Sequence, residues 1–150
     1  MIKSITPFLW FDNQAHEAAQ FYVSLFPNSA IESSTEMITT FTLSGQRFMA
    51  LNGGPVFTFN EAFSIFVSVE TQADVDDLWE KLLADGGAES RCGWLTDKFG
   101  LSWQIIPTLL GELMNDDNEV KARAVFEAMM KMVKIDVAAL QRAYDSALSS

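Results

Sequence analysis

The sequence predicts an α+β fold, and two observations indicate it. Within residues 2–106 a strand pattern is followed by a helical pattern and then by several short strand patterns, and this order occurs twice. Beyond Pro107 the apolar residues recur only at helical spacing. Because each half is too small to bury its own sheet face, we expect one domain, with modules at about 1–55 and 62–107 and a helical tail at about 108–150.

The first module opens with a strand pattern over residues 2–11. From Asn13 the spacing becomes helical, Asp12 or Asn13 can cap the helix, and its apolar face consists of Ala15, Ala18, Phe21, Tyr22 and Leu25. Two or three antiparallel strands are expected over 30–43 and 47–52. The run Asn52-Gly53-Gly54-Pro55 then ends the sheet; it is more typical of a turn than of a loop that presents backbone amides to a ligand.

A strand over residues 63–69 opens the second module, and Thr71 is placed to cap the helix that follows. That helix ends at Gly86-Gly87, and its apolar face consists of Val75, Leu78, Trp79 and Leu82. Short strands follow, and the last covers 101–106. In the tail, Pro107 suits a first helical position, Asp136 can cap the last helix, and an apolar stripe predicts packing against the rest of the chain: Val125, Ala128, Met129 and Met132.

Composition and charge exclude several classes of partner. Ten basic and twenty acidic residues give a formal charge of −10, which repels the phosphates of nucleic acids and anionic membrane surfaces. The first residues lack the pattern of a signal peptide and no apolar run is long enough to cross a membrane, so we expect a soluble, cytoplasmic protein. With one cysteine, Cys92, and one histidine, His16, the chain can form neither an internal disulfide nor a zinc site rich in these residues.

Alternation along the predicted strands divides the sheet residues between two faces. One face is almost entirely apolar and should carry the helices: Ile5, Leu9, Phe11, Ile65, Val67, Val69, Leu101, Trp103 and Ile105. The other mixes aromatic rings with neutral polar groups: Thr6, Phe8, Trp10, Ala50, Asn52, Ser64, Phe66, Ser68, Ser102 and Gln104. This mixture is typical of a small-molecule pocket, although these polar groups could also satisfy one another or bind water.

Several sequence runs resemble a known family. They are Pro7-Phe8-Leu9-Trp10-Phe11-Asp12, Glu17-Ala18-Ala19-Gln20-Phe21-Tyr22, Leu51-Asn52-Gly53-Gly54-Pro55, Asn60-Glu61-Ala62, Cys92-Gly93-Trp94 and the run from Asp97 to Ile105. Together they are similar to the PhnB-like proteins labelled 3-demethylubiquinone-9 3-methyltransferase, a branch of the vicinal oxygen chelate superfamily that includes glyoxalase I and bleomycin resistance proteins. The resemblance implies one domain of paired βαβββ modules and a homodimer. Between Ser29 and Phe41 this chain is shorter than the family pattern, which predicts either a shorter hairpin or the loss of a mobile loop, and with that loop of any lid it would form.

The metal chemistry of the superfamily does not carry over to this sequence. Members that use a metal resemble one another in placing His, Glu or Gln at four inward positions. Here the matching positions hold Thr6 or Pro7, a residue near Asn52, Ser64 and Gln104, and none is a carboxylate or an imidazole. We therefore expect neither a metal nor another cofactor. His16 falls away from the apolar face of its helix and is expected to be exposed.

Two further residues could carry chemistry. Cys92 precedes the final hairpin and could border the cavity, which makes it a weak candidate for a nucleophile, although cysteine often only fills space. Glu61 would be a general base only if it were buried, and an exposed loop carboxylate is commoner.

Three classes of function remain open. The first is a binding protein or a metal-independent enzyme that holds a small, partly aromatic molecule, with the expected contacts Trp10, Asn52, Ser64, Phe66, Trp94, Trp103 and Gln104; Trp103 is the exception in parity, since it points toward the helices. The second is the methyltransferase that the family label implies, although the chain lacks the glycine-rich turn of Rossmann-type enzymes. The third is an interaction module whose cavity is filled by its own side chains.

Overall fold

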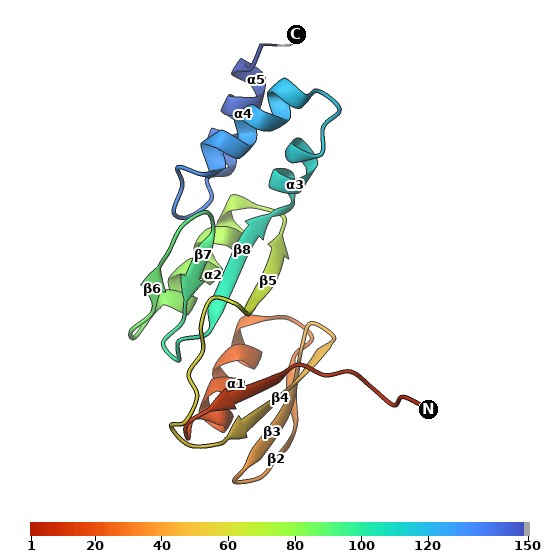
Figure 1. Cartoon of the computed structure of the whole chain (residues 1–150), viewed down its shortest axis with the longest axis vertical. Helices are drawn as coiled ribbons and strands as arrows, with labels where there is room; N and C mark the ends of the chain where they lie inside the picture. The colour runs from red at the N-terminus through yellow and green to blue at the C-terminus, as the bar shows by residue number, and fades with distance from the viewer. Residues whose placement is uncertain (149–150) are drawn as a thin grey trace. The chain divides into compact units, whose positions relative to one another are not determined.

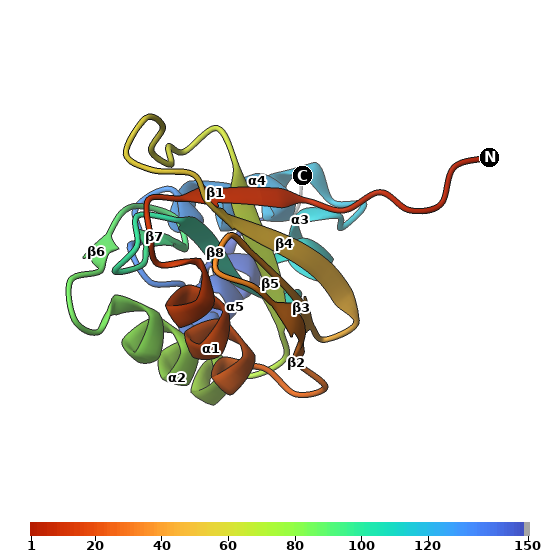
Figure 2. The same ribbon diagram turned by 90° about the horizontal axis from the view of Figure 1, so that it is seen from below.

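The computed structural model describes residues 1–148 and divides into two compact units, Met1–Phe59 and Asn60–Ser150 (Figure 1). The first unit is the predicted first module, and the second unit combines the second module with the helical tail. Figure 2 gives the view at right angles, in which the helix of each module can be followed beside its sheet. The predicted α+β fold of paired βαβββ modules with a helical extension is confirmed. That the two modules form one domain stays a prediction.

The first module is a four-stranded mixed sheet with one helix. Its elements are β1 (Phe8–Phe11), α1 (Ala15–Leu25), β2 (Ala30–Ser34), β3 (Ile38–Leu43) and β4 (Gln46–Asn52). The strands lie in the order β1-β4-β3-β2, with β1 parallel to β4 and the other neighbours antiparallel. Only residues 35–37 join β2 to β3, which confirms the short hairpin expected there.

The second module repeats this topology. Its elements are β5 (Ser64–Val69), α2 (Gln72–Leu83), β6 (Ala88–Glu89), β7 (Trp94–Thr96) and β8 (Ser102–Pro107). The strand order is β5-β8-β7-β6, and β5 runs parallel to β8. Thr71 caps α2 as predicted, since its hydroxyl accepts from the Asp74 backbone N–H at 3.1 Å while the Asp74 carboxylate accepts from the Thr71 N–H.

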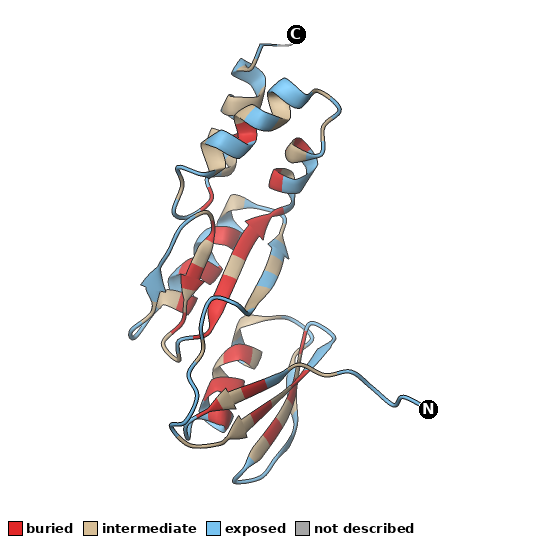
Figure 3. Ribbon diagram, in the orientation of Figure 1, coloured by how far each residue is buried: buried red, intermediate tan, exposed pale blue. Residues whose placement is uncertain are grey.

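In each module, one sheet face is buried against the helix. In the first module, Leu9, Phe11 and Phe41 are almost fully buried together with Ala18 and Tyr22 of α1 (Figure 3). In the second module, Leu95, Trp103 and Ile105 are buried with the apolar face of α2. The apolar faces that alternation predicted therefore carry the helices, apart from Ile5, which is 87% exposed because the first strand covers only Phe8–Phe11 rather than residues 2–11.

Two predictions about the first module are wrong. Ala50 and Asn52 were expected on the open face, but Ala50 pairs with Leu9 and Thr39, and all three are buried beneath α1. Asn52 shares this phase of β4, and its Oδ1 accepts from the backbone N–H of Ala15 at 2.8 Å. Neither Asp12 nor Asn13 caps α1, because Asn52, the register partner of Phe11 on the neighbouring strand β4, satisfies this donor instead.

The tail consists of α3 (Thr108–Met114), α4 (Glu119–Met129) and α5 (Val137–Ser146). Asn118 and Asp136 cap the second and third of these helices through their side-chain oxygens. A core of its own joins the tail to the end of β8: Ile106, Leu110, Leu113, Val125, Ile135 and Leu140. The prediction that the tail packs against the rest of the chain is confirmed. None of the helices described within residues 1–148 is both long and apolar enough to cross a lipid bilayer.

Candidate functional site

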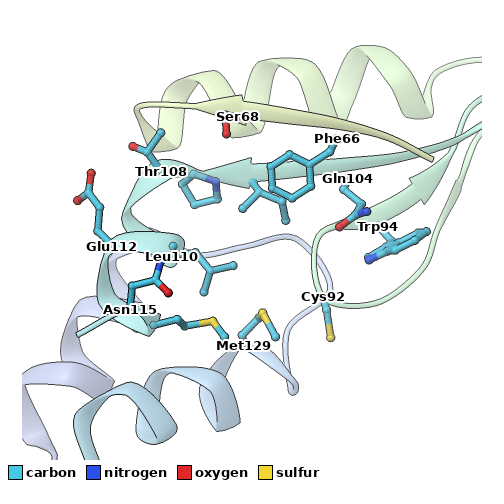
Figure 4. A pocket seen from close by; sticks show the side chains of 14 residues that line it. Phe66, Ser68, Cys92, Trp94, Gln104, Thr108, Leu110, Glu112, Asn115 and Met129 are labelled. Carbon is cyan, nitrogen blue, oxygen red and sulfur yellow. The ribbon is translucent and has the colours of Figure 1, made fainter. Parts of the chain in front are cut away.

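A pocket of about 550 Å³ lies in the second unit, between the open face of its sheet and the tail helices (Figure 4). This volume falls in the range typical of small-molecule sites. The sheet contributes one wall, with Phe66, Ser68, Trp94, Gln104 and Ile106. The tail contributes the other, with Thr108, Leu110, Glu112, Asn115 and Met129 among its residues.

The sheet wall follows from the alternation of side chains along β5, β7 and β8. Trp94 pairs with Gln104 and Phe66 pairs with Gln104 in register, so these three side chains lie in one row across the sheet. Phe66 lies on the edge strand β5 and is 58% exposed, which is high for a phenylalanine. Gln104 Nε2 donates to Ser64 Oγ at 3.0 Å, and the carboxamide oxygen of Gln104 is thereby left to accept from a ligand.

The tail wall is built mainly by one face of α3. Thr108, Glu112 and Asn115 follow one another at spacings of four and three residues, so they lie along one side of the helix. Leu113 lies on the opposite side, in the tail core, while Leu110 belongs both to that core and to the pocket lining. The apolar stripes of the tail predicted packing only, and this wall was missed, although the polar residues at helical spacing were a signal that could have found it.

Cys92 borders the pocket, as its place before the final hairpin suggested. It has a positive φ of 58°, and its backbone N–H donates to the Met132 carbonyl at 2.8 Å. Its Sγ lies 3.9 Å from the Met130 sulfur. A second hollow of about 490 Å³ shares Cys92, Trp94 and Met129 with the first and adds Glu61 and Arg91. Glu61 is exposed, as expected of a loop carboxylate.

Four of the seven predicted ligand contacts lie outside the lining of this pocket: Trp10, Asn52, Ser64 and Trp103. Trp10 belongs to the first module, where its indole N–H donates to the Gly54 carbonyl at 2.9 Å and its ring lies so close that a Cβ at Gly53 would collide with it. Asn52 caps α1 and also donates to the Glu36 carbonyl at 2.9 Å. Trp103 is fully buried on the helix side of β8, and its indole N–H donates to the Asp97 carboxylate at 2.8 Å.

The remaining predicted residues divide as follows. Phe66, Trp94 and Gln104 line the pocket, and Ser64 supports it through its hydrogen bond to Gln104. His16 is exposed on α1, where its Nδ1 lies 2.8 Å from Ser34 Oγ. The glycines at 53 and 54 serve to seat the Trp10 ring, which favours the turn interpretation of this run.

The donor set does not fit the metal that the superfamily uses. Among the described residues there is no group of three or more His, Cys, Asp or Glu side chains placed to hold a metal ion. Of the positions considered for ligands, Ser64 and Gln104 are hydrogen-bonded to each other, and Asn52 is engaged by backbone groups. Neutral hydroxyl and amide groups are poor ligands for divalent transition metals, so these residues do not fit such an ion.

Comparison with solved structures defines the class of protein. A PhnB protein from Bacillus cereus, provisionally assigned to the 3-demethylubiquinone-9 3-methyltransferases, is 37% identical; the match covers 70% of this chain and 99% of that one, with a TM-score of 0.64. Protein PA1353 from Pseudomonas aeruginosa is 20% identical over 71% of this chain and 98% of that one, with a TM-score of 0.57. A glyoxalase-related enzyme from Fulvimarina pelagi is 16% identical over 73% and 91%, with a TM-score of 0.52. The chain therefore shares its fold with these proteins, the glyoxalase-related enzyme among them.

The particular family follows from the sequence. The pattern that defines the family described as 3-demethylubiquinone-9 3-methyltransferase matches residues 3–106, and the chain belongs to this PhnB-like family. A comparison with curated proteins finds no match. The matched residues end before α3, so the tail wall of the pocket lies outside the region that the family shares.

Proposed function

We propose that the protein binds a small, partly aromatic molecule in the pocket of the second unit, either as a binding protein or as a metal-independent enzyme. The observation that supports the proposal most directly is the exposed ring of Phe66. It lies in one row with Trp94 and Gln104 on the sheet wall of a pocket of about 550 Å³. Apolar walls with a few polar groups at defined places are what such ligands require. We propose the same three residues as ligand contacts, with Ser64 orienting the Gln104 carboxamide.

The methyltransferase named in the family description is a less well supported alternative. Its only support is that description, which the Bacillus cereus protein shares. Methyltransferases of the Rossmann type hold S-adenosylmethionine at a glycine-rich turn between a strand and a helix. In the described chain the connections from β1 to α1 and from β5 to α2 contain no glycine. An interaction module without a ligand is less favoured still, because the pocket is not filled by its own side chains.

Thermal denaturation in the presence of ligands tests the proposal. A panel of neutral aromatic and quinone-like compounds, such as 1,4-naphthoquinone and 4-phenylbutanol, should contain compounds that raise the melting temperature of the protein, because a ligand that binds only the native state stabilises it. S-adenosylmethionine in the same panel tests the alternative. Stabilisation by S-adenosylmethionine alone would favour the methyltransferase, and no shift with any compound would contradict both.

A pair of phenylalanine variants localises the binding. Phe66 and Phe8 lie on corresponding strands of the two modules and are similarly exposed, at 58% and 52%. Phe66→Ala should weaken binding of the stabilising compound by roughly tenfold, since an aromatic contact contributes about 1–2 kcal/mol. Phe8→Ala should leave the affinity unchanged. Equal effects of the two variants would show that the pocket of the second unit is not the site.

We also propose that the protein is a cytoplasmic homodimer that does not bind nucleic acid or membranes. The family resemblance supports the dimer, and the exposed side chains of Val56 and Phe57 offer apolar surface for a contact. The formal charge of −10 supports the exclusion of polyanionic partners. Analytical ultracentrifugation at micromolar concentration would detect the dimer, and a monomer across the concentration range would contradict it.

A further inference from the structure

The charge of the pocket lining is one-sided. Of the described residues that line it, Glu112 carries a negative charge and none is Lys, Arg or His. The whole chain adds to this field, since its formal charge is −10. An anionic ligand would therefore enter against the field and would find no basic side chain in the lining, whereas a cationic ligand would gain from both.

The neutral part of the lining also suits a positive group. The faces of aromatic rings attract cations, and Phe66 and Trp94 provide such rings on the sheet wall. Gln104 offers its carboxamide oxygen as an acceptor, while one N–H of its amide is donated to Ser64. A ligand that donates hydrogen bonds, as an ammonium group does, matches this acceptor.

The lining is arranged along the pocket rather than around one point. Trp94 lies at one end and Glu112 at the other, with Leu110 and Phe66 between them (Figure 4). An elongated molecule with an apolar body can therefore place an aromatic ring near Trp94 and a charged end near Glu112. The tail supplies the charged end of the site.

The tail wall is also what separates this chain from a relative in its own family. The family pattern ends at residue 106, and the Bacillus cereus PhnB protein is covered over 99% of its length by 70% of this chain. That protein is therefore too short to have a counterpart for the whole of the remaining chain. Glu112 of α3 and Asn115, the C-cap of that helix, lie beyond the shared region.

We propose that this pocket selects aromatic amines, that is, elongated molecules with an aromatic ring at one end and an ammonium group at the other, over their anionic analogues, and that Glu112 of the tail sets this preference. The inference rests on the proposed function, because it names the class of ligand for the same pocket. Glu112 is exposed at the rim, so it acts as a screened charge rather than as a buried ion-pair partner.

Three probes with the same skeleton test the inference: 4-phenylbutylammonium, 4-phenylbutanol and 4-phenylbutyrate. They carry a cation, a neutral hydroxyl group and an anion at the same end; the ammonium compound and the alcohol have identical apolar parts, and in the carboxylate the last methylene group is replaced by the carboxyl carbon. Affinities are measured at pH 7 and low ionic strength by NMR titration of the Trp94 indole N–H signal. We expect the ammonium compound to bind most tightly and the carboxylate most weakly.

Two variants isolate the role of Glu112. Glu112→Gln should weaken binding of the ammonium compound by roughly 1.5- to 5-fold, the size expected of an exposed ion pair, and should leave the affinity for the alcohol unchanged. Asp117→Asn is the matched control, since it removes the same charge from an exposed residue of the tail that does not line the pocket. In 0.3 M salt the difference between the wild type and Glu112→Gln should shrink.

The outcomes separate this inference from the proposed function. Binding of the alcohol that depends on Phe66, with no preference for the ammonium compound over the carboxylate, would overturn the inference and leave the proposed function standing. An equal loss of ammonium binding in Glu112→Gln and Asp117→Asn would overturn the role of Glu112. If none of the three probes bound, nor any compound of the neutral aromatic panel, the proposed function itself would fall.

Discussion

The two modules share one topology but use their polar residues differently. Each has a parallel strand pair flanked by antiparallel strands, with one sheet face buried against a helix. In the first module, the polar side chain at the end of β4 caps the helix, and the tryptophan of β1 is fixed to the glycine turn. In the second module, Phe66, Trp94 and Gln104 line a pocket because the tail provides a second wall. The two modules therefore share a scaffold, and the additional helices close a pocket over the sheet of one of them.

The largest expected effect concerns the polar residue that holds the second module together. Asp97 is 2% exposed, and its carboxylate accepts from the backbone N–H groups of Phe99 and Leu101 and from the indole N–H of Trp103. Asp97→Ala leaves three donors without this partner, and we expect a loss of roughly 2–4 kcal/mol in the free energy of unfolding. Urea denaturation measures this loss. Trp103→Phe removes only one of the three donors and should lower the free energy of unfolding less. A loss below about 1 kcal/mol in Asp97→Ala would contradict the stabilising role of the Asp97 carboxylate.

A polar residue of the first module, Asn52, should have a smaller effect on stability. Asn52 is half-buried and accepts from one backbone donor, the N–H of Ala15 at the start of α1. Asn52→Ala should lower the free energy of unfolding by about 1–2 kcal/mol, as the loss of a helix cap does. Because Asn52 lies in the first unit, the same variant should bind 4-phenylbutanol as the wild type does. Weakened binding with unchanged stability would restore the ligand role that the sequence suggested for Asn52.

The comparison of the two modules also shows why the sequence predicted the sheet wall of the pocket but not the tail wall. Alternation placed Phe66 and Gln104 on the open face because β5 and β8 carry clear apolar residues on their opposite face. On β4 the phase was ambiguous, since Phe48, Ala50 and Leu51 are all apolar and lie on both faces. Pairing with Leu9 and Thr39 settles the phase, and the strand's own sequence does not contain that information.

The helix cap and the tail wall show the same limit in different ways. The cap of α1 comes from a residue 37 positions away, and local signals such as Asp12 and Asn13 cannot reveal it. The tail wall was readable in part, since Thr108, Glu112 and Asn115 share one face of a helix. What the sequence could not show is that this face lies opposite Phe66 and Trp94.

The smallest expected effect is a pH-dependent stability of the tail that the first module should not share. The backbone N–H of Asn118, the Tyr144 hydroxyl and the charge of Lys121 together hold the pKa of Asp116 below its usual value, and Asp116 in turn raises the pKa of Tyr144. An acid whose pKa is lowered on folding stabilises the folded state above its unfolded pKa, and this contribution is lost as the pH falls through the folded value. For Tyr144 the sign is opposite: its contribution is present below its unfolded pKa and is lost as the pH rises through the raised value.

The Tyr144 hydroxyl of α5 donates to the Asp116 carboxylate, which lies just before α4, at 2.7 Å. Acidification from pH 6 to pH 3 should therefore weaken this contact. Hydrogen exchange of α5 amides, corrected for intrinsic rates, measures this opening, and the amides of α1 serve as the internal reference. Tyr144→Phe removes the hydroxyl but keeps the aromatic ring over which Lys121 lies. The α5 amides of this variant should exchange faster than those of the wild type at pH 6, and the difference in rate should be smaller at pH 3. A difference that stayed constant with pH would show that Asp116 does not act through Tyr144, and the acid response of the tail would then rest on its bond to the Asn118 backbone.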